Sequence, residues 1–340
     1  MSEYEGAAVS GLTSTGEATR EDTASSALAR ANKTSTAVVV VNFGSHELIR
    51  RNFGSLDLAA VGARLVVVDN LRSAADTEAI RALAAEHDWR LVETGRNAGF
   101  GAGVNAGARV ALDEGADVLV VANPDLATSA EVVAELAAAV RADRDVAVAP
   151  RIVRPDGSLW FGGGVISLDE ARTRLVPDAA PDGGPASGVS PRTPPWLSGA
   201  CFAMHRDLWT TVAGFDADYF LYWEDVDLSY RVVKAGGRLA VRQDLVAVHD
   251  VGGTQHDVTQ RAKSSTYYYY SCRNRLVFAA KHLDRRDRRR WVRTTPADSR
   301  RVLLRGGRRQ LVAPHRTLWP VVKGAAAGTV WLVVHRARPS

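Results

Sequence analysis

The fold is indicated first by Val118-Leu119-Val120-Val121-Ala122-Asn123-Pro124-Asp125, a continuous apolar run that ends in a polar turn. Two earlier stretches, Val38-Val39-Val40-Val41-Asn42 and Leu65-Val66-Val67-Val68-Asp69, repeat the pattern. Short β-branched runs of this kind are typical of parallel strands buried on both faces. Apolar residues recur at helical spacing over 77–87 and 128–140, after the second and third runs. This alternation predicts an α/β fold with a mostly parallel central sheet flanked by helices.

The composition is that of a globular protein. With 340 residues, 46% of them hydrophobic, the chain can bury a large core. Its two cysteines lack the spacing of a zinc site or a disulfide framework, which favours a reducing cytoplasm. No apolar run reaches the roughly 18 residues of a spanning helix, and the N-terminal region lacks a signal peptide's apolar stretch. We therefore expect neither secretion nor a membrane span.

Three segments are expected along the chain. Residues 1–35, rich in Ser, Thr, Ala and Glu, predict a disordered N-terminal tail. Residues 36–284 predict the main folded domain, with a Pro/Gly/Ser-rich surface loop over 176–195 and a closing helix over 266–282. Residues 285–340 predict a basic helical C-terminal extension.

The charge of the chain is concentrated in that extension. Residues 285–340 hold fifteen Arg or Lys against two Asp, although the net charge of the whole chain is only +5. A block this basic attracts phosphates of an anionic membrane surface or of nucleic acid, and the alternative is a solvated tail. The membrane surface is favoured, because 318–334 is apolar and too short to span, with Trp319 and Trp331 as interfacial anchors.

Polar residues follow each of the three predicted strands: Asn42, Asp69, and Asn123 with Asp125. The carboxyl ends of parallel strands meet at one edge of a sheet, where ligands bind. Singly, such residues are usually turn or cap residues. Together at one edge they favour a binding site.

A glycine-rich run lies between the second and third strand ends: Asn97-Ala98-Gly99-Phe100-Gly101-Ala102-Gly103-Val104-Asn105-Ala106-Gly107. Glycines let a ligand approach the backbone, and the helix that follows offers free N–H groups to a phosphate. The alternative is that the glycines serve only tight helix packing. The run also satisfies the dinucleotide pattern G-x-G-x-x-A, but that fingerprint belongs in the first β-α turn of its fold.

Three carboxylates gather at the start of a predicted helix, in Tyr222-Trp223-Glu224-Asp225-Val226-Asp227. Clustered acids repel one another, and at the mouth of a helix one of them can act as a general base while the next caps the backbone. The alternative is an acidic helix start that the helix dipole favours. Arg231, four residues after Asp227, is placed to pair with it.

These pieces occur in an order that resembles the inverting family-2 glycosyltransferases of GT-A fold, and their rhamnosyltransferase-like members in particular. The resemblance covers about residues 36–278. The matching pieces are Val40-Val41-Asn42-Phe43, Val67-Val68-Asp69-Asn70, Asn97-Ala98-Gly99-Phe100-Gly101 with Asn105, Asn123-Pro124-Asp125, Gly199-Ala200, Trp223-Glu224-Asp225-Val226-Asp227, His249, and Tyr268-Tyr269-Tyr270-Ser271-Cys272-Arg273-Asn274-Arg275.

The resemblance implies transfer of a sugar from a nucleoside diphosphate donor to an acceptor hydroxyl, with inversion at the anomeric carbon. By match to the motif, Asp225 is the base and Glu224 orients the acceptor. Asp125 and His249 hold a divalent cation, Mn²⁺ or Mg²⁺, although Asn123 stands where the D-x-D motif has its first carboxylate. The donor-binding residues implied are Asn42, Asp69, Asn97, Gly99, Asn105, Asn123, Gly199 and Ala200.

The reaction expected is transfer of L-rhamnose from dTDP-rhamnose to a cell-envelope or lipid-linked glycan, at the inner face of the cell membrane and without nucleic acid. A UDP-sugar transferase of galactofuranosyl or hexosyl type is the nearest alternative. A non-catalytic glycan-binding relative and a dinucleotide-dependent oxidoreductase stay open. The rings of Tyr267-Tyr268-Tyr269-Tyr270 cannot all face inward, so some are expected to meet the acceptor, a lipid surface or a second copy in a homodimer.

Overall fold

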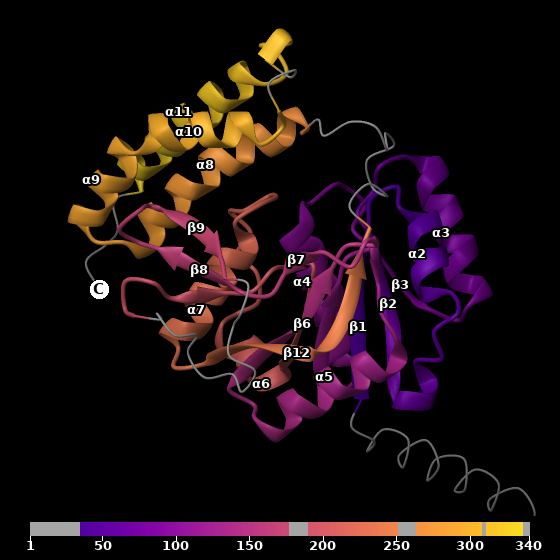
Figure 1. Ribbon diagram of the computed structural model, residues 1–340. Coiled ribbons are helices and arrows are strands. Elements are labelled where there is room, and N and C mark those ends of the chain that lie inside the picture. The colour runs from indigo at the N-terminus through magenta and orange to yellow at the C-terminus, as the bar shows by residue number, and fades with distance from the viewer. Residues whose placement is uncertain (1–34, 177–189, 251–262, 308–310, 336–340) are drawn as a thin grey trace, which may run out of the picture. The chain divides into compact units, whose positions relative to one another are not determined.

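The computed structural model describes residues 35–176, 190–250, 263–307 and 311–335. Ser35–Ser340 form one compact unit, drawn in Figure 1. The disordered tail expected over 1–35 lies outside the described residues except for Ser35, which begins the first strand. The loop expected over 176–195 also lies mostly outside them.

A central sheet runs through this unit in the order β3-β2-β1-β4-β11-β6-β12-β5 among the described residues, with β7 beside β6. The pairs β1–β2, β1–β4, β2–β3 and β6–β12 are parallel, which confirms the expected parallel α/β core. The strands are β1 (Ser35–Asn42), β2 (Ala63–Asp69), β3 (Arg90–Glu93), β4 (Ala116–Ala122), β5 (Leu126–Ala127), β6 (Val146–Val153), β7 (Leu159–Phe161), β11 (Cys201–His205) and β12 (Arg238–His249).

Strand β11 departs from the parallel pattern. It enters between β4 and β6 and runs antiparallel to both, although it follows them in the chain by about fifty residues or more. Strand β12 runs over twelve residues without a break. Its pairing with β6 shifts register between Arg242 and Val246, which marks a bulge or similar irregularity.

Helices flank the sheet (Figure 1). Helix α4 packs against β1 and β2, and α5 packs against β6 and β11. A Cβ atom on Gly107 would lie 2.6 Å from Val68 and 2.7 Å from Val39, so α4 approaches the sheet closely only because this residue is glycine. The helices of this half are α2 (His46–Phe53), the short η1 (Ala59–Val61), α3 (Ala74–Glu86), α4 (Phe100–Asp113), α5 (Ala130–Ala142) and α6 (Arg206–Thr211).

The later half of the chain adds a small sheet and a group of helices. The small sheet has the order β10-β8-β9 and the larger helices gather around α8 (Figure 1). These elements are β8 (Gly164–Ser167), β9 (Arg172–Leu175), β10 (Pro195–Trp196), α7 (Glu224–Lys234), α8 (Ser265–His282), α9 (Arg285–Arg293), α10 (Thr295–Leu304) and α11 (Leu318–Val334).

The basic C-terminal helices are packed into this unit. Trp291 of α9 is fully buried against Phe278 of α8 and Trp223. Helix α11 lies along α8 with Gly324 and Gly328 at the contact, where a Cβ on Gly324 would meet the carbonyl of Tyr269 at 2.2 Å. The boundary expected after Asp284 therefore falls between two helices of one unit. Among the described residues, no helix combines the length and apolarity needed to cross a membrane.

Candidate active site

The acidic helix α7 begins after two residues with left-handed backbone. Tyr222 has a φ of 65° and Trp223 a φ of 74°, conformations that cost a non-glycine residue on the order of 1 kcal/mol each. The buried amide of Asn274 on α8 donates from Nδ2 to the carbonyls of Leu221 (3.0 Å) and Tyr222 (2.8 Å). Helix α8 thus holds the turn that orients the first residues of α7.

Glu224 and Asp225 lie side by side at this helix start in different environments. Asp225 accepts hydrogen bonds from the backbone N–H groups of Gly199 (3.0 Å) and Val226 (2.8 Å). Burial raises its pKa, and these two bonds oppose the rise. Glu224 is 6% exposed and its Oε2 has no hydrogen-bond partner among the described residues. Burial and the neighbouring Asp225 raise the pKa of Glu224 well above its ordinary value, so the pair favours an ionised Asp225 beside a protonated Glu224.

The third acid, Asp227, braces the helix. It is fully buried and forms the expected ion pair with Arg231 (2.7 Å), together with a 2.6 Å contact to His282 of α8. Burial acts to raise its pKa, but the bond from His282 and the charge of Arg231 outweigh that effect and lower it. Asp227 therefore fastens α7 to α8 and is not free to react.

A chain of backbone contacts joins the acids to the sheet edge. The N–H of Gly199 binds Asp225, and the carbonyl of the adjacent Ala200 accepts from the N–H of Asn123 at 2.9 Å. Both small residues are buried. A Cβ on Gly199 would lie 3.3 Å from Phe100 and 3.4 Å from Asp225, so a methyl group there would already touch both neighbours.

Asp125 and His249 meet at the same edge. Nε2 of His249 lies 3.4 Å from Oδ1 of Asp125, and both side chains are about nine-tenths buried. The imidazole stacks on Trp160 with ring centroids 4.4 Å apart, and its buried Nδ1 has no hydrogen-bond partner among the described residues. Burial lowers the pKa of His249, and the charge of Asp125 opposes this. The ring is thus neutral at pH 7, as a metal ligand must be.

These two side chains fit a divalent cation. Two ligands each about 2.1 Å from one ion lie roughly 3 Å apart, close to the observed spacing. Within the described ranges, no group of three or more His, Cys, Asp or Glu residues is placed to hold a metal. The remaining ligands of such an ion would have to come from a bound diphosphate and water.

Asn42 and Asp69 are paired across β1 and β2. Asn42 donates to Oδ1 of Asp69 at 3.1 Å, while Thr77 donates to Oδ2 at 2.6 Å. Both residues are almost fully buried. These hydrogen bonds fix the orientation of both side chains before any ligand binds.

The glycine-rich run is organised by asparagines. The buried Asn70 donates to the carbonyl of Gly99 and to Asn97, and accepts from Ala98 N–H. Gly99 has a φ of +90°, and a Cβ there would lie 2.2 Å from the carbonyl of Phe220. The side-chain amide of Asn105 is engaged by the backbone of Phe215. It donates a hydrogen bond to the Phe215 carbonyl (2.7 Å) and accepts one from the Phe215 N–H (2.9 Å).

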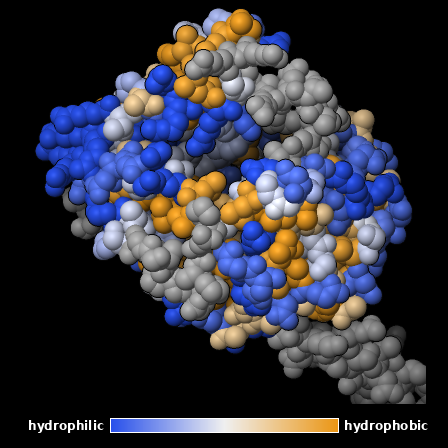
Figure 2. Space-filling model, viewed as in Figure 1, coloured by the Kyte–Doolittle hydropathy of each residue, from blue (hydrophilic) through white to orange (hydrophobic). Residues whose placement is uncertain are grey.

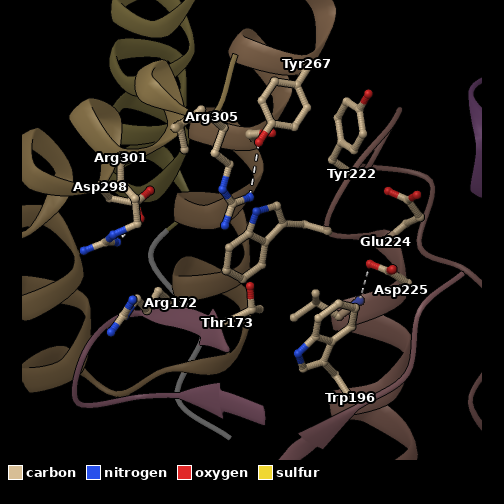
Figure 3. Close-up of a pocket in the computed structure, with 14 residues that line it drawn as sticks. Arg172, Thr173, Trp196, Tyr222, Glu224, Asp225, Tyr267, Asp298, Arg301 and Arg305 are labelled. Carbon is tan, nitrogen blue, oxygen red and sulfur yellow. Dashed lines mark hydrogen bonds and ion pairs between the residues drawn. The ribbon is translucent and has the colours of Figure 1, made fainter. Parts of the chain in front are cut away.

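The acids open into a cavity of ≈ 210 Å³, shown in Figure 3. Glu224 and Asp225 lie on one side of it, and Arg172, Arg301 and Arg305 on the other. The aromatic residues that line it are Trp196, Tyr222, Trp223 and Tyr267. Sequence reasoning placed the acids but did not place the arginines, Asn70 or Asn274 at the site. Both asparagines do lie within the motifs that carry the family resemblance, and this position could have marked them as candidate site residues.

The class of protein follows from a comparison with known families. Residues 27–183 match the family model described as Glycosyl transferase family 2, a little under half of the chain. This part of the chain is therefore similar to the family-2 glycosyltransferases.

The chain is also similar to curated glycosyltransferases, among them a rhamnosyltransferase. An N-acetylglucosaminyl-diphospho-decaprenol L-rhamnosyltransferase of Mycobacterium tuberculosis is 34% identical over 177 residues, which are 43% of this chain and 54% of the relative. The chain thus spans about half the length of this curated relative. A low-salt glycan biosynthesis hexosyltransferase of Haloferax volcanii is 25% identical over 227 residues, 63% of this chain and 66% of the relative.

A solved structure supports the fold. The mannosyltransferase of Pyrobaculum calidifontis, in complex with GDP-Man and Mn²⁺, has a TM-score of 0.50 and 15% identity, and the match covers 90% of this chain and 88% of that one. This likeness confirms the expected GT-A fold.

Proposed function

We propose that this protein is an inverting glycosyltransferase that moves a sugar, L-rhamnose from dTDP-rhamnose, to a hydroxyl of a lipid-linked glycan acceptor. The observation that carries the proposal is the placement of Glu224 and Asp225 together at a cavity. Backbone hydrogen bonds of Gly199 and Ala200 link Asp225 to Asn123 at the sheet edge. The similarity to the mycobacterial rhamnosyltransferase supports the choice of sugar and of a diphospholipid-linked acceptor.

Asp225 acts as the base in this proposal. Its two backbone hydrogen bonds fix the carboxylate, and its raised pKa makes it a stronger proton acceptor than an exposed aspartate. It takes the proton of the acceptor hydroxyl as that oxygen attacks the anomeric carbon from the face opposite the leaving diphosphate. The protonated Glu224 donates a hydrogen bond to the acceptor and so orients it.

Asp125 and His249 would hold a divalent cation, Mn²⁺ or Mg²⁺. The cation supplies positive charge that stabilises the nucleoside diphosphate as it leaves. Asn123, which replaces the first acid of the D-x-D motif, would hydrogen-bond the donor instead. Asn42 and Asp69 would line the nucleobase pocket, while Asn97, Gly99 and the helix start that follows them approach the diphosphate. Asn105 would act indirectly, because its amide holds Phe215.

The protein would work at an anionic membrane surface, at the inner face of the cell membrane. The outward side of α11 exposes a stripe of large apolar side chains: Leu318, Trp319, Val322, Val330, Val333 and Val334. Figure 2 shows apolar side chains at the top of the C-terminal helices and a hydrophilic surface over α9. Apolar side chains beside arginines suit the boundary between acyl chains and anionic headgroups.

The membrane proposal is tested with liposomes. The protein is expected to bind anionic vesicles at low salt, and the double variant Trp319→Ser, Val330→Ser should bind them at least tenfold more weakly. Protein that ignores anionic vesicles at low salt would refute it. A homodimer stays a prediction.

The donor is identified by thermal shift against dTDP, UDP, GDP and NADH, since a ligand that binds only the folded state stabilises it by about 2.7 kcal/mol at a hundred times its Kd. We expect dTDP to give the largest shift. A dominant UDP shift would instead favour a galactofuranosyl or hexosyl transferase, and NADH binding would favour an oxidoreductase.

Catalysis is tested with Asp225→Asn. The variant should lose at least about 10²-fold in turnover with donor affinity nearly unchanged, because the proton loses its acceptor while the nucleotide pocket is intact. Near-normal turnover would remove Asp225 from the role of base. Donor binding without turnover in the wild type would identify a non-catalytic glycan-binding relative.

A further inference from the structure

On the side of the cavity away from Glu224 and Asp225, three arginines face a single lining carboxylate, Asp298. Arg172 comes from β9, Arg301 from α10, and Arg305 directly follows α10. Figure 3 shows the three arginines on the side of the cavity away from Glu224 and Asp225. Because Arg172 is distant in sequence from Arg301 and Arg305, the fold itself brings the three side chains to one cavity.

The carboxylates on this side are fewer than the cations. Arg301 pairs with Asp298 at 2.8 Å, but Asp298 also lies 3.5 Å from the buried guanidinium of Arg275. Arg172 bonds to Glu170, which Arg174 shares at 2.9 Å. Each carboxylate therefore serves two guanidinium groups, and positive charge is left over.

Arg305 carries the clearest excess. Among the described residues, no carboxylate lies within ion-pair distance of it, and its Nη1 donates to the hydroxyl of Tyr267 at 3.2 Å. Lys263 lies over the same tyrosine, with Nζ 5.6 Å from the ring centroid. Burial, and next the charge of Arg305, lower the pKa of Lys263. Two cations beside one another without a carboxylate between them make a site that an anion would stabilise.

We propose that these arginines form a phosphate subsite for the acceptor. The acceptor sugar is joined to a phosphate or diphosphate that Arg172, Arg301 and Arg305 bind, while a hydroxyl of the same sugar reaches Asp225. This rests on the proposed function, and it separates the acceptor's phosphate from the donor diphosphate at Asp125 and His249. Trp196 and Tyr222, which line the cavity beside the acids, provide faces for the sugar ring.

The subsite gives the basic C-terminal helices a second role. Helix α10 brings Arg301 and Arg305 to the cavity, while α11 presents its apolar stripe to the exterior. An acceptor anchored by a lipid would reach the acids from this side, with its charged linkage bound at the arginines.

The test compares two soluble acceptors: N-acetylglucosamine joined through a diphosphate to a short alkyl chain, and the same sugar as a neutral alkyl glycoside. Calorimetry measures binding of each to the full chain, without need for transfer. Arg305→Ala should weaken binding of the diphosphate compound about tenfold relative to the neutral one, the scale of one charge-assisted hydrogen bond. Arg300→Ala, an exposed arginine of the same helix, is the matched control and should change neither affinity.

The outcomes separate the subsite from the proposed function. Equal affinity of the wild type and Arg305→Ala for the diphosphate compound overturns the subsite, whether or not sugar is transferred. If Arg305→Ala weakens binding of nucleoside diphosphate as much as it weakens binding of the diphosphate compound, the arginines belong to the donor site, and the subsite is also overturned. If the compound binds and Arg305→Ala weakens it, but no donor supports transfer, the subsite stands and the proposed function fails.

Discussion

Replacing Glu224 with glutamine should remove a pH-dependent loss of stability. Glu224 is buried, its Oε2 has no partner among the described residues, and its pKa is raised well above the ordinary 4.5 by burial and by Asp225. The folded state then holds a proton that the unfolded state has released. The free energy of unfolding therefore falls as the pH rises from about 4.5 towards the raised pKa, by about 1.4 kcal/mol per pH unit for one proton.

Glutamine has nearly the same volume and no charge, so the variant should lack this slope. Urea unfolding of both proteins between pH 4 and 7 measures it: the variant should gain stability over the wild type as the pH rises, and lose the advantage below pH 4.5. Glu131→Gln is the control, because the pKa of Glu131 is lowered by Ser129 and both of its states are ionised above pH 5. Parallel slopes for the wild type and Glu224→Gln would show that Glu224 is ionised in the folded protein.

Three further predictions follow from the site and its supports. Asp125→Ala should weaken diphosphate binding far more than nucleoside binding, and chelation should lower activity that Mn²⁺ restores; full activity in excess chelator would exclude a cation at Asp125 and His249. Asn274→Ala should cost roughly 1–3 kcal/mol of stability and lower kcat more than it raises the donor KM, since the Tyr222 turn loses its donor; unchanged kcat would separate that turn from catalysis. Gly324→Val should destabilise the protein by roughly 1–3 kcal/mol, because α11 must move away from α8, whereas Ala326→Val on the exposed side should not; equal melting temperatures would refute the close contact.

The parallel half of the fold could be predicted because its signals are local. Runs such as Leu65–Val68 are apolar on both faces, and each is followed by a helix, which leaves few alternatives to a parallel sheet. The direction of β11 carries no such signal, since its four apolar residues and His205 can pair equally well in either direction. Its place between β4 and β6 is set by contacts distant in sequence.

The acidic residues of the site could be predicted from the sequence, but the residues that hold them in place could not. Three carboxylates within four residues repel one another strongly enough to stand out in a sequence. An amide partner is chosen by tertiary structure, so nothing in Asn105 alone reveals that it binds Phe215, or in Asn274 that it holds Tyr222. Charge counting indicated the basic extension correctly, yet it could not show that Arg301 and Arg305 point into the cavity while Arg300 faces out.

The position of β11 has a consequence for how the chain is made. While the ribosome is still adding residues before Cys201, β4 and β6 both lack their shared neighbour, so two hydrogen-bonding edges of the nascent sheet stay open. The segment that matches the family model ends at residue 183, before that strand exists. That segment therefore lacks the strand that joins β4 to β6. The sheet is complete only when β11, which is made later, inserts between β4 and β6. Contacts between residues so distant in sequence favour slow folding and dependence on chaperones.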